Sequence, residues 1–292
     1  MSNIQVQDRI NYVGASEVAA VVGLNKWKSR LAVWMEKAGK VPREDIMGKI
    51  PIRVGMALES HIASWWANDH NCEITRYDRY LVHPKMPRYG ASLDYIMGEE
   101  DKPDSVVEIK TVSEKSFGYW PPGAPPTNYI IQVQAQMDIA DVGEGFLVVL
   151  VGNRSIETYR LVRRPTLGGL LRDKVEEFWK SVDDDTPPPP DFKADADVIS
   201  HLAPADNKII KGDEDYDKMI VEHNRLRAKR RDIDGQIKTL SGKIRHRMVE
   251  DGAIRVNADH GGAGLYYNEG FDVPARTQKA FWKLVVKGVP RR

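Results

Sequence analysis

The sequence has few of the features that mark several common classes of protein. Cys72 is the single cysteine among 292 residues. It excludes a disulfide framework, a cysteine-based zinc site and an iron–sulfur cluster, and it fits a reducing compartment. None of the seven histidines has another histidine at a spacing typical of metal ligands. No apolar run approaches the ~20 residues of a membrane span, and the N-terminus has no apolar segment of signal-peptide length. We therefore expect a soluble, cytoplasmic protein with no membrane partner.

The chain also lacks a strong net charge. Lysine and arginine number 43 against 42 acidic residues, so the formal net charge is +1. The global field therefore attracts no particular partner, and a nucleic-acid site would need a local basic patch. The length of 292 residues is enough for one sizeable core and an appended segment.

An acidic, proline-rich segment divides the chain into a core, a linker and an extension. The segment 183–191 reads DDDTPPPPD, an acidic and proline-rich break with extended character. We predict a core over residues 1–182, a linker over 183–212, and a C-terminal extension over 213–292. The predicted elements of the core are helices over 14–23, 29–39, 55–68, 128–139 and 167–182, and strands over 73–83, 145–152 and 155–162.

The extension begins with one long helical pattern. Over 213–251, apolar residues recur at alternating spacings near three and four, which is typical of a coiled-coil seam. The same helix carries a basic run over 225–231, which is either a solvated face or a contact with DNA or another partner. The tail from 253 onward predicts a small β-hairpin around the glycine-rich sequence at 261–264 and a basic end.

The most informative stretch is 91–111. Two short apolar runs flank residues 98–104, which contain glycine, proline and four acidic residues, so we predict a β-hairpin with a longer loop. Asp94 and Glu108 lie at equal distances from Asp101, the midpoint of the turn. If the register follows the turn, their carboxylates face each other with Cβ atoms about 5 Å apart. Lys110 follows two residues later on the same face.

Two opposed carboxylates repel each other unless a cation lies between them. An all-oxygen site suits Mg²⁺ or Mn²⁺, and a neighbouring ammonium group can hold an anionic nucleophile or a phosphate. A solvated strand face with an ordinary Glu–Lys pair explains the same residues, and this stretch alone does not separate the two interpretations.

Other segments supply further candidates. Glu59 lies beside an apolar stripe of Leu58, Ile62, Trp65 and Trp66. It is either a carboxylate stabilised by its position near the helix N-terminus or a third carboxylate directed at the hairpin site. Gln132 and Gln136 share one face of their predicted helix. Ser16 is also a candidate N-cap. Lys26, Trp27 and Lys28 form a basic-aromatic loop, although Trp27 could instead close the core.

Five elements occur in a fixed order: GASE, a glycine spaced before Glu59, a strand with Asp94, the EIK of residues 108–110, and the QVQAQM of residues 132–137. In this order they resemble the YqaJ-type viral recombinases, the family of phage lambda exonuclease, within the PD-(D/E)xK nuclease superfamily. The resemblance covers roughly residues 8–182. It implies an α/β (α+β) restriction-endonuclease-like core with a central mixed sheet flanked by helices, here followed by the long helix and β-hairpin extension. Leu93 stands where the motif has proline.

Carried over to this sequence, the resemblance assigns roles to individual residues. Asp94, Glu108 and the Ile109 carbonyl would bind metal, Lys110 would be the catalytic lysine, and Glu59 would support a second ion. Gln132 would line the active site, with Tyr129 beside it. Further residues would contact DNA: Arg9 and Ser16 at the 5′-phosphate, and Lys26, Trp27 and Lys28 elsewhere.

The function that follows is a Mg²⁺- or Mn²⁺-dependent 5′→3′ exonuclease with two ions, encoded by a phage or prophage of a bacterial host. It would digest linear duplex DNA to leave 3′ single-stranded overhangs for recombination. The resemblance also implies a homotrimer and a single-strand annealing protein as partner. The alternatives are an endonuclease or a nuclease of different polarity on the same fold, a non-catalytic DNA-binding recombination scaffold, and a dimeric adaptor built on the 213–251 helix.

Overall fold

The computed structural model describes residues 10–43, 45–195, 199, 211–268, 271–273, 276–278 and 281–288. The chain divides into two compact units, Met1–Ala205 and Asp206–Arg292. Among the described helices, none combines the length and apolar character that a membrane crossing requires.

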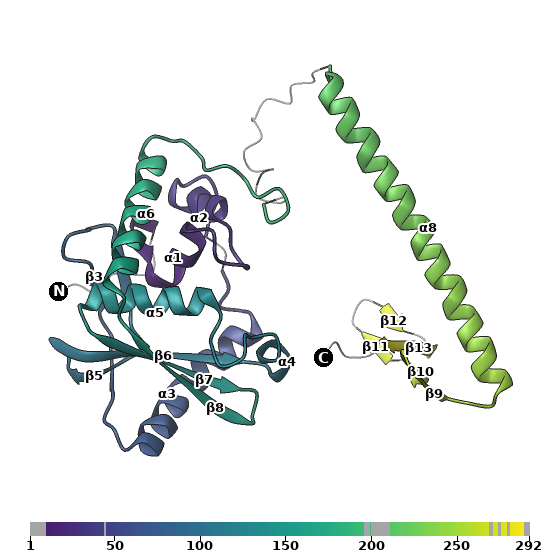
Figure 1. Cartoon of the computed structure of the whole chain (residues 1–292), viewed down its shortest axis with the longest axis horizontal. Helices are drawn as coiled ribbons and strands as arrows, with labels where there is room; N and C mark the ends of the chain where they lie inside the picture. Colours follow the sequence, from purple (N-terminus) through teal and green to yellow (C-terminus); the bar gives the residue numbers. More distant parts are fainter. Residues whose placement is uncertain are drawn as a thin grey trace. The chain divides into compact units, whose positions relative to one another are not determined.

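The first unit is built on a mixed sheet with helices on both faces (Figure 1). The five-stranded sheet has the order β2-β5-β6-β7-β8, in which only β6 and β7 are parallel. A smaller sheet has the order β1-β4-β3. The elements are β1 (Val13–Gly14), α1 (Ala15–Val21), α2 (Arg30–Lys37), α3 (Ile50–His70), β2 (Thr75–Arg76), β3 (Tyr80–Val82), β4 (Tyr89–Ser92), β5 (Tyr95–Glu99), β6 (Lys102–Val112), α4 (Glu114–Phe117), α5 (Thr127–Ala140), β7 (Glu144–Val151), β8 (Ser155–Val162) and α6 (Pro165–Asp183). The predicted mixed α/β core is confirmed.

The side chains of β6 alternate between two hydrophobic layers, as the period of two requires. Val106 belongs to the larger cluster, which includes residues of α1, α5 and α6. Val107 and Ile109 belong to a smaller cluster with Ile62 and Trp66 of α3. Accordingly, α5 covers one face of the sheet and α3 the other (Figure 1). Glu108 therefore falls on the α5 face, between two residues that point toward α3.

Some local predictions were wrong. The N-cap of α1 is Gly14, and Ser16 lies inside the helix. The hairpin turn is tight, because β5 continues to Glu99 and β6 begins at Lys102, with a register shift after Met97. Trp65 does not join the apolar stripe of α3, because it is 48% exposed.

The chain beyond α6 returns to the core before the second unit begins. Asp195 is buried, and its carboxylate accepts hydrogen bonds from Ser29 Oγ and from the Asp191 backbone N–H. Ser29 is also the N-cap of α2, as predicted. Part of the segment assigned to a linker is therefore fixed on α2, while the predicted domain limits stay a prediction.

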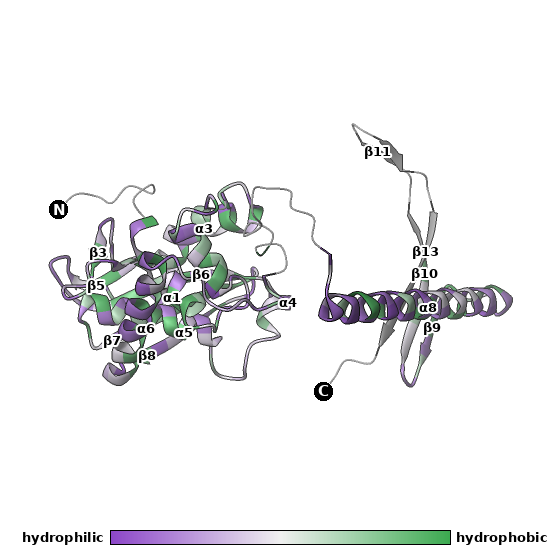
Figure 2. Ribbon diagram, turned by 90° about the horizontal axis from the view of Figure 1, so that it is seen from above, coloured by the Kyte–Doolittle hydropathy of each residue, from purple (hydrophilic) through white to green (hydrophobic). Residues whose placement is uncertain are grey.

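The second unit consists of one long helix and short antiparallel strands. Its elements are α8 (Glu214–Glu250), β9 (Arg255–Ala258), β10 (Gly261–Asn268), β11 (Phe271–Val273), β12 (Arg276–Gln278) and β13 (Phe281–Gly288). Strands β9, β10 and β13 form one sheet, and β11 pairs with β12. Figure 2 shows hydrophobic and hydrophilic residues alternating along α8. The first turn of the tail lies at Asp259 and His260, so the glycine-rich sequence opens β10 and does not form the turn.

Candidate active site

The β5–β6 hairpin brings together the two carboxylates predicted to face each other. In the observed register Tyr95 pairs with Val107. Asp94 directly precedes Tyr95 and Glu108 directly follows Val107, so the two acidic residues lie at the next position of the ladder. Asp94 Oδ2 accepts a hydrogen bond of 2.9 Å from the Ile109 backbone N–H, which fixes that carboxylate against β6.

Glu108 is held by three donors. It is 2% exposed. Oε1 accepts from Lys110 Nζ and, at 2.5 Å, from Gln132 Nε2, while Oε2 accepts from Gln136 Nε2 at 2.5 Å. Gln136 Nε2 also lies 3.3 Å from the Ser92 carbonyl oxygen. The shared face predicted for the two glutamines is confirmed, and α5 acts as a clamp on this carboxylate.

The close approach of α5 to the sheet depends on Gly145 of β7. A Cβ at this position would lie 2.8 Å from Val106 Cγ2 and 2.9 Å from Val133 Cγ1, which is too close for any larger residue. The glycine therefore lets α5 pack near enough for Gln132 and Gln136 to reach Glu108.

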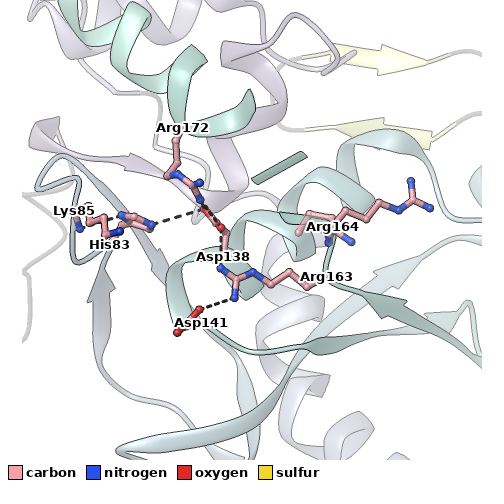
Figure 3. Close-up of polar contacts among 8 residues, drawn as sticks. His83, Lys85, Asp138, Asp141, Arg163, Arg164 and Arg172 are labelled. Carbon is pink, nitrogen blue, oxygen red and sulfur yellow. Dashed lines mark hydrogen bonds and ion pairs between the residues drawn. The ribbon is translucent and has the colours of Figure 1, made fainter. Parts of the chain in front are cut away.

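The opposite face of α5 is anchored by a buried ion-pair cluster around Asp138 (Figure 3). Arg172 of α6 donates to both carboxylate oxygens at 2.6 Å, and Arg163 Nη2 donates at 3.1 Å. His83 Nε2 lies 3.8 Å from the same carboxylate, and burial lowers the pKa of His83. Arg163 also contacts Asp141. This cluster joins α5 to α6 and to the loop after β3, and so holds the glutamine clamp in place.

Burial and neighbouring charges shift the pKa values of Asp94 and Lys110. Burial, followed by repulsion from Glu108, raises the pKa of Asp94 to about 7, and the Lys110 charge and the Ile109 N–H only partly offset this. Burial opposes the charged form of Lys110, but attraction to Glu108 and Asp94 outweighs it and raises the Lys110 pKa above its usual value. The site thus carries more negative charge than its own lysine neutralises, as expected of a cation site.

A pocket of about 220 Å³ opens over these groups. Its lining includes five of the predicted site residues, Ser16, Asp94, Glu108, Lys110 and Gln132. The other lining residues are Tyr12, Gly14, Ala15, Glu17, Arg43, Tyr80 and Ser92. Ser16 therefore shares a cavity with the carboxylates. Arg43 and Tyr80 were not predicted, because their place in the pocket depends on long-range packing.

A buried ion pair supports the part of the pocket lining that α1 provides. Glu17 Oε2 accepts from the Gly14 backbone N–H at 3.1 Å and from Lys37 Nζ at 2.8 Å. The Lys37 side chain is 3% exposed, and burial lowers its pKa although Glu17 partly opposes the shift. The pair thus fixes the first turn of α1, which presents Ser16 to the pocket.

Other predicted residues lie away from this cavity or outside the described residues. Arg9 falls outside them. Glu59, on α3, is half-buried and does not line the pocket, although its charge contributes to the raised pKa of Asp94. Tyr129 is near enough to influence Lys110 and packs on Trp120.

The basic-aromatic loop does not reach the pocket lining. Trp27 is 78% exposed, so the suggestion that it closes the core is wrong. Lys26 lies over the Trp27 ring, and Lys28 pairs with Glu36 at 2.6 Å. DNA contacts by this loop stay a prediction.

The donor set fits a hard divalent cation. Asp94 and Glu108 supply carboxylate oxygens, which Mg²⁺ and Mn²⁺ prefer, and a cation between them would relieve the repulsion that raises the Asp94 pKa. Within the described part of the chain, no three His, Cys, Asp or Glu side chains cluster closely enough to form a metal site by themselves. Mg²⁺ usually keeps several waters and needs only one or two carboxylates, so a pair of acidic residues is sufficient.

The first half of the chain is similar to a known protein family. Residues 6–143 match the family described as YqaJ-like viral recombinase domain. This part of the chain is therefore similar to the YqaJ-like viral recombinases. The region includes both carboxylates, Lys110 and the two glutamines of α5, so the predicted resemblance to this family is confirmed.

Individual relatives are distant. A YqaJ protein of Bacillus subtilis (strain 168), described as uncharacterized, is 24% identical over 286 residues, which cover 96% of this chain and 82% of that protein. An alkaline exonuclease from Laribacter hongkongensis is 20% identical, with a TM-score of 0.48 over 68% of this chain and 97% of its own. A phage-related exonuclease from Haemophilus somnus 129PT is 13% identical, with a TM-score of 0.47 over 66% and 96%.

Proposed function

We propose that this YqaJ-like protein is a Mg²⁺- or Mn²⁺-dependent deoxyribonuclease that digests linear duplex DNA from its 5′ ends and leaves 3′ single-stranded overhangs. The observation that carries the proposal is the pairing of Asp94 and Glu108 beside Lys110 in a pocket that also contains Ser16. A binding module has no need to keep two carboxylates together where phosphates would approach.

The carboxylates of Asp94 and Glu108, with the Ile109 carbonyl, would hold the cation. When bound, such an ion supplies a Lewis acid for the scissile phosphate and lowers the pKa of its water. Lys110 would orient the attacking water and offset the negative charge that develops on the phosphate. Gln132 and Gln136 would keep Glu108 aligned through their 2.5 Å hydrogen bonds. Glu59 is the candidate for supporting a second ion.

The pocket residues around Ser16 would recognise the DNA terminus. Ser16 Oγ, the Arg43 guanidinium and the predicted contribution of Arg9 would bind a terminal 5′-phosphate, for which a guanidinium fork is well suited. Holding that phosphate beside the carboxylates would fix the polarity of digestion, because the strand would enter the pocket by its 5′ terminus.

The test is digestion of end-labelled linear duplex in Mg²⁺ and in chelator. Lys110→Ala should abolish digestion while DNA binding persists, because the lysine acts on the reacting water. Lys102→Ala, at the start of the same strand and outside the pocket, is the matched control and should digest normally. Digestion by Lys110→Ala at the wild-type rate would refute the assignment.

Two further assays test the requirement for a DNA end and the preference for a 5′-phosphate separately from the catalytic residues. Closed circular duplex should remain intact, since the enzyme would require an end. A 5′-phosphorylated end should be digested faster than a 5′-hydroxyl end, and Ser16→Ala should reduce that difference. Equal rates on both ends would remove the role proposed for Ser16 and Arg43 without affecting the catalytic assignment.

The source of the DNA ends and the protein partner are inferred from the family. The DNA ends would be those of phage or host DNA in the bacterial cytoplasm, with a single-strand annealing protein as partner. A homotrimer stays a prediction.

A further inference from the structure

Tyr80 brings a phenol ring to the pocket from the small sheet. It lies in β3, and in the antiparallel ladder with β4 its partner is Ser92, which also lines the pocket. Residues directly opposite each other in such a ladder project from the same face of the sheet. The register therefore directs the Tyr80 side chain toward the cavity that also contains Asp94 and Glu108.

Gly90 leaves room for this ring. It lies on β4 two residues before Ser92, and so on the same face as Tyr80. A Cβ at position 90 would lie 2.4 Å from Tyr80 Cε1 and 2.9 Å from Tyr80 Cζ, which is too close for any larger residue. Tyr12 packs edge-to-face on the same ring, with ring centroids 5.4 Å apart and 65° between the ring planes. These two contacts fix the position of the ring, and hence the place of its hydroxyl group.

The Tyr80 hydroxyl lies near Ser16 and the start of α1. A Cβ built on Gly14 would be 3.9 Å from Tyr80 Oη and 3.9 Å from Ser16 Oγ. Both hydroxyl groups therefore converge on the same part of the pocket lining, to which Arg43 also belongs. Two donors in this arrangement can reach different oxygens of one phosphate group.

The charges around these hydroxyl groups suit a phosphate bound next to a metal site. Glu17 Oε2 lies 3.7 Å from the same built Cβ, but its charge is offset by Lys37 Nζ at 2.8 Å. A hydroxyl donor adds a hydrogen bond without adding positive charge, which would oppose the binding of a divalent cation at Asp94 and Glu108. A tyrosine therefore suits this position better than another cationic side chain.

We propose that Tyr80 is a specificity-determining residue whose phenolic hydroxyl donates a hydrogen bond to the terminal 5′-phosphate of the DNA. The ligand is a phosphate monoester at the end of a strand, and the hydroxyl group distinguishes it from a 5′-hydroxyl end. The inference rests on the proposed function, because it requires a DNA terminus in this pocket. It assigns no part of the hydrolysis to Tyr80.

The first test is the variant Tyr80→Phe, which removes the hydroxyl group and keeps the ring packed on Gly90 and Tyr12. On 5′-phosphorylated linear duplex in Mg²⁺ it should lower kcat/KM roughly tenfold or more, because a hydrogen bond to a charged group is lost. The loss should appear mainly as a higher KM, since the contact is the same in the bound substrate and in the transition state. On the same duplex with a 5′-hydroxyl end, the rate should equal that of wild type.

Tyr89→Phe is the matched control. Tyr89 lies on β4 of the same sheet, is 0% exposed and does not line the pocket. Its hydroxyl group is buried and has no hydrogen-bond partner among the described residues. The control should therefore digest both kinds of end as wild type does. An equal loss of the 5′-phosphate preference in both variants would mean that the small sheet, and not the Tyr80 hydroxyl, determines the preference.

A binding measurement tests Tyr80 without any digestion. The probe is a hairpin duplex with a fluorophore in its loop and either a 5′-phosphate or a 5′-hydroxyl at its one open end. In a Lys110→Ala background with Mg²⁺, fluorescence anisotropy gives the dissociation constant of each probe. Adding Tyr80→Phe should weaken binding of the phosphorylated probe roughly tenfold and leave binding of the hydroxyl probe unchanged.

The failure of this inference is distinguishable from the failure of the proposed function. Unchanged digestion and binding of phosphorylated ends by Tyr80→Phe would refute the role of the hydroxyl group. Equal losses on phosphorylated and hydroxyl ends would also refute it, because the residue would then act on the reaction or on another part of the strand. If the wild-type protein did not digest linear duplex in Mg²⁺, the proposed nuclease would be wrong, and the binding measurement would still decide whether Tyr80 recognises the terminal phosphate.

Discussion

Replacing Gln136 with methionine separates the clamp on Glu108 from ordinary packing. Gln136 is 1% exposed, and its Nε2 is the donor to Glu108 Oε2 at 2.5 Å. Methionine has similar volume but no donor. A hydrogen bond to a charged group contributes about 1.5–3 kcal/mol, so the melting temperature should fall by roughly 3–12 °C for a domain of this size.

The same change should reduce activity. Removing a group that orients a metal-binding carboxylate typically costs about 10- to 100-fold in metal affinity or activity. We expect that loss in the digestion rate of linear duplex, measured below the melting temperature so that the enzyme is folded. Part of it should be recovered at high Mg²⁺ concentration if the carboxylate binds the ion less tightly.

Gln134 supplies the matched control on the other face of α5. It is 2% exposed, its Nε2 donates to the Val162 carbonyl at 2.8 Å, and its Oε1 accepts from the Arg164 N–H at 2.9 Å. Gln134→Met should therefore lower stability comparably while the rate of the folded enzyme stays near wild type. Equal losses of activity in the two variants, or full activity in Gln136→Met, would refute the clamp.

Three further predictions follow. Lys37→Met leaves the Glu17 carboxylate buried without its cation and should lower the free energy of unfolding by about 3 kcal/mol in urea titrations, with a smaller preference for 5′-phosphorylated ends. Asp138→Asn weakens the cluster that holds α5 and should cost about 3 kcal/mol in the same titration, with little effect on the rate of the folded enzyme. In chelator, the Asp94 pKa is 3.8 in the unfolded chain and about 7 in the folded protein, so the folded state binds more protons between these two pH values. Stability should therefore fall as pH rises through that range, and less so in Asp94→Asn.

A specific result would contradict each of these three predictions. Adding Glu17→Gln to Lys37→Met should recover part of the lost stability, and no recovery would argue against an uncompensated charge. A large loss of digestion rate in folded Asp138→Asn would mean that the cluster acts on the site directly. Identical pH dependence in wild type and Asp94→Asn would show that another group titrates there.

Local patterns in the sequence were enough for the centre of the site. The period of two along a strand and the symmetry about Asp101 placed Asp94 opposite Glu108, and the observed register agrees although the turn is tighter than predicted. The helical period placed Gln132 and Gln136 on one face. The apolar spacing that predicted α8 is local in the same sense, since heptad spacing is a property of one helix.

The surroundings of the site depended on contacts between distant segments. Glu17 and Lys37 meet across two helices, and Arg43 reaches the pocket from a loop, so no spacing along the chain could predict them. Gln132 and Gln136 reach Glu108 because Gly145 has no side chain and lets α5 pack close to the sheet. Sequence alone determined which carboxylates face each other, because strand and helix periods repeat over a few residues. Only the tertiary structure decided what holds and surrounds them, because burial and long-range packing set those distances.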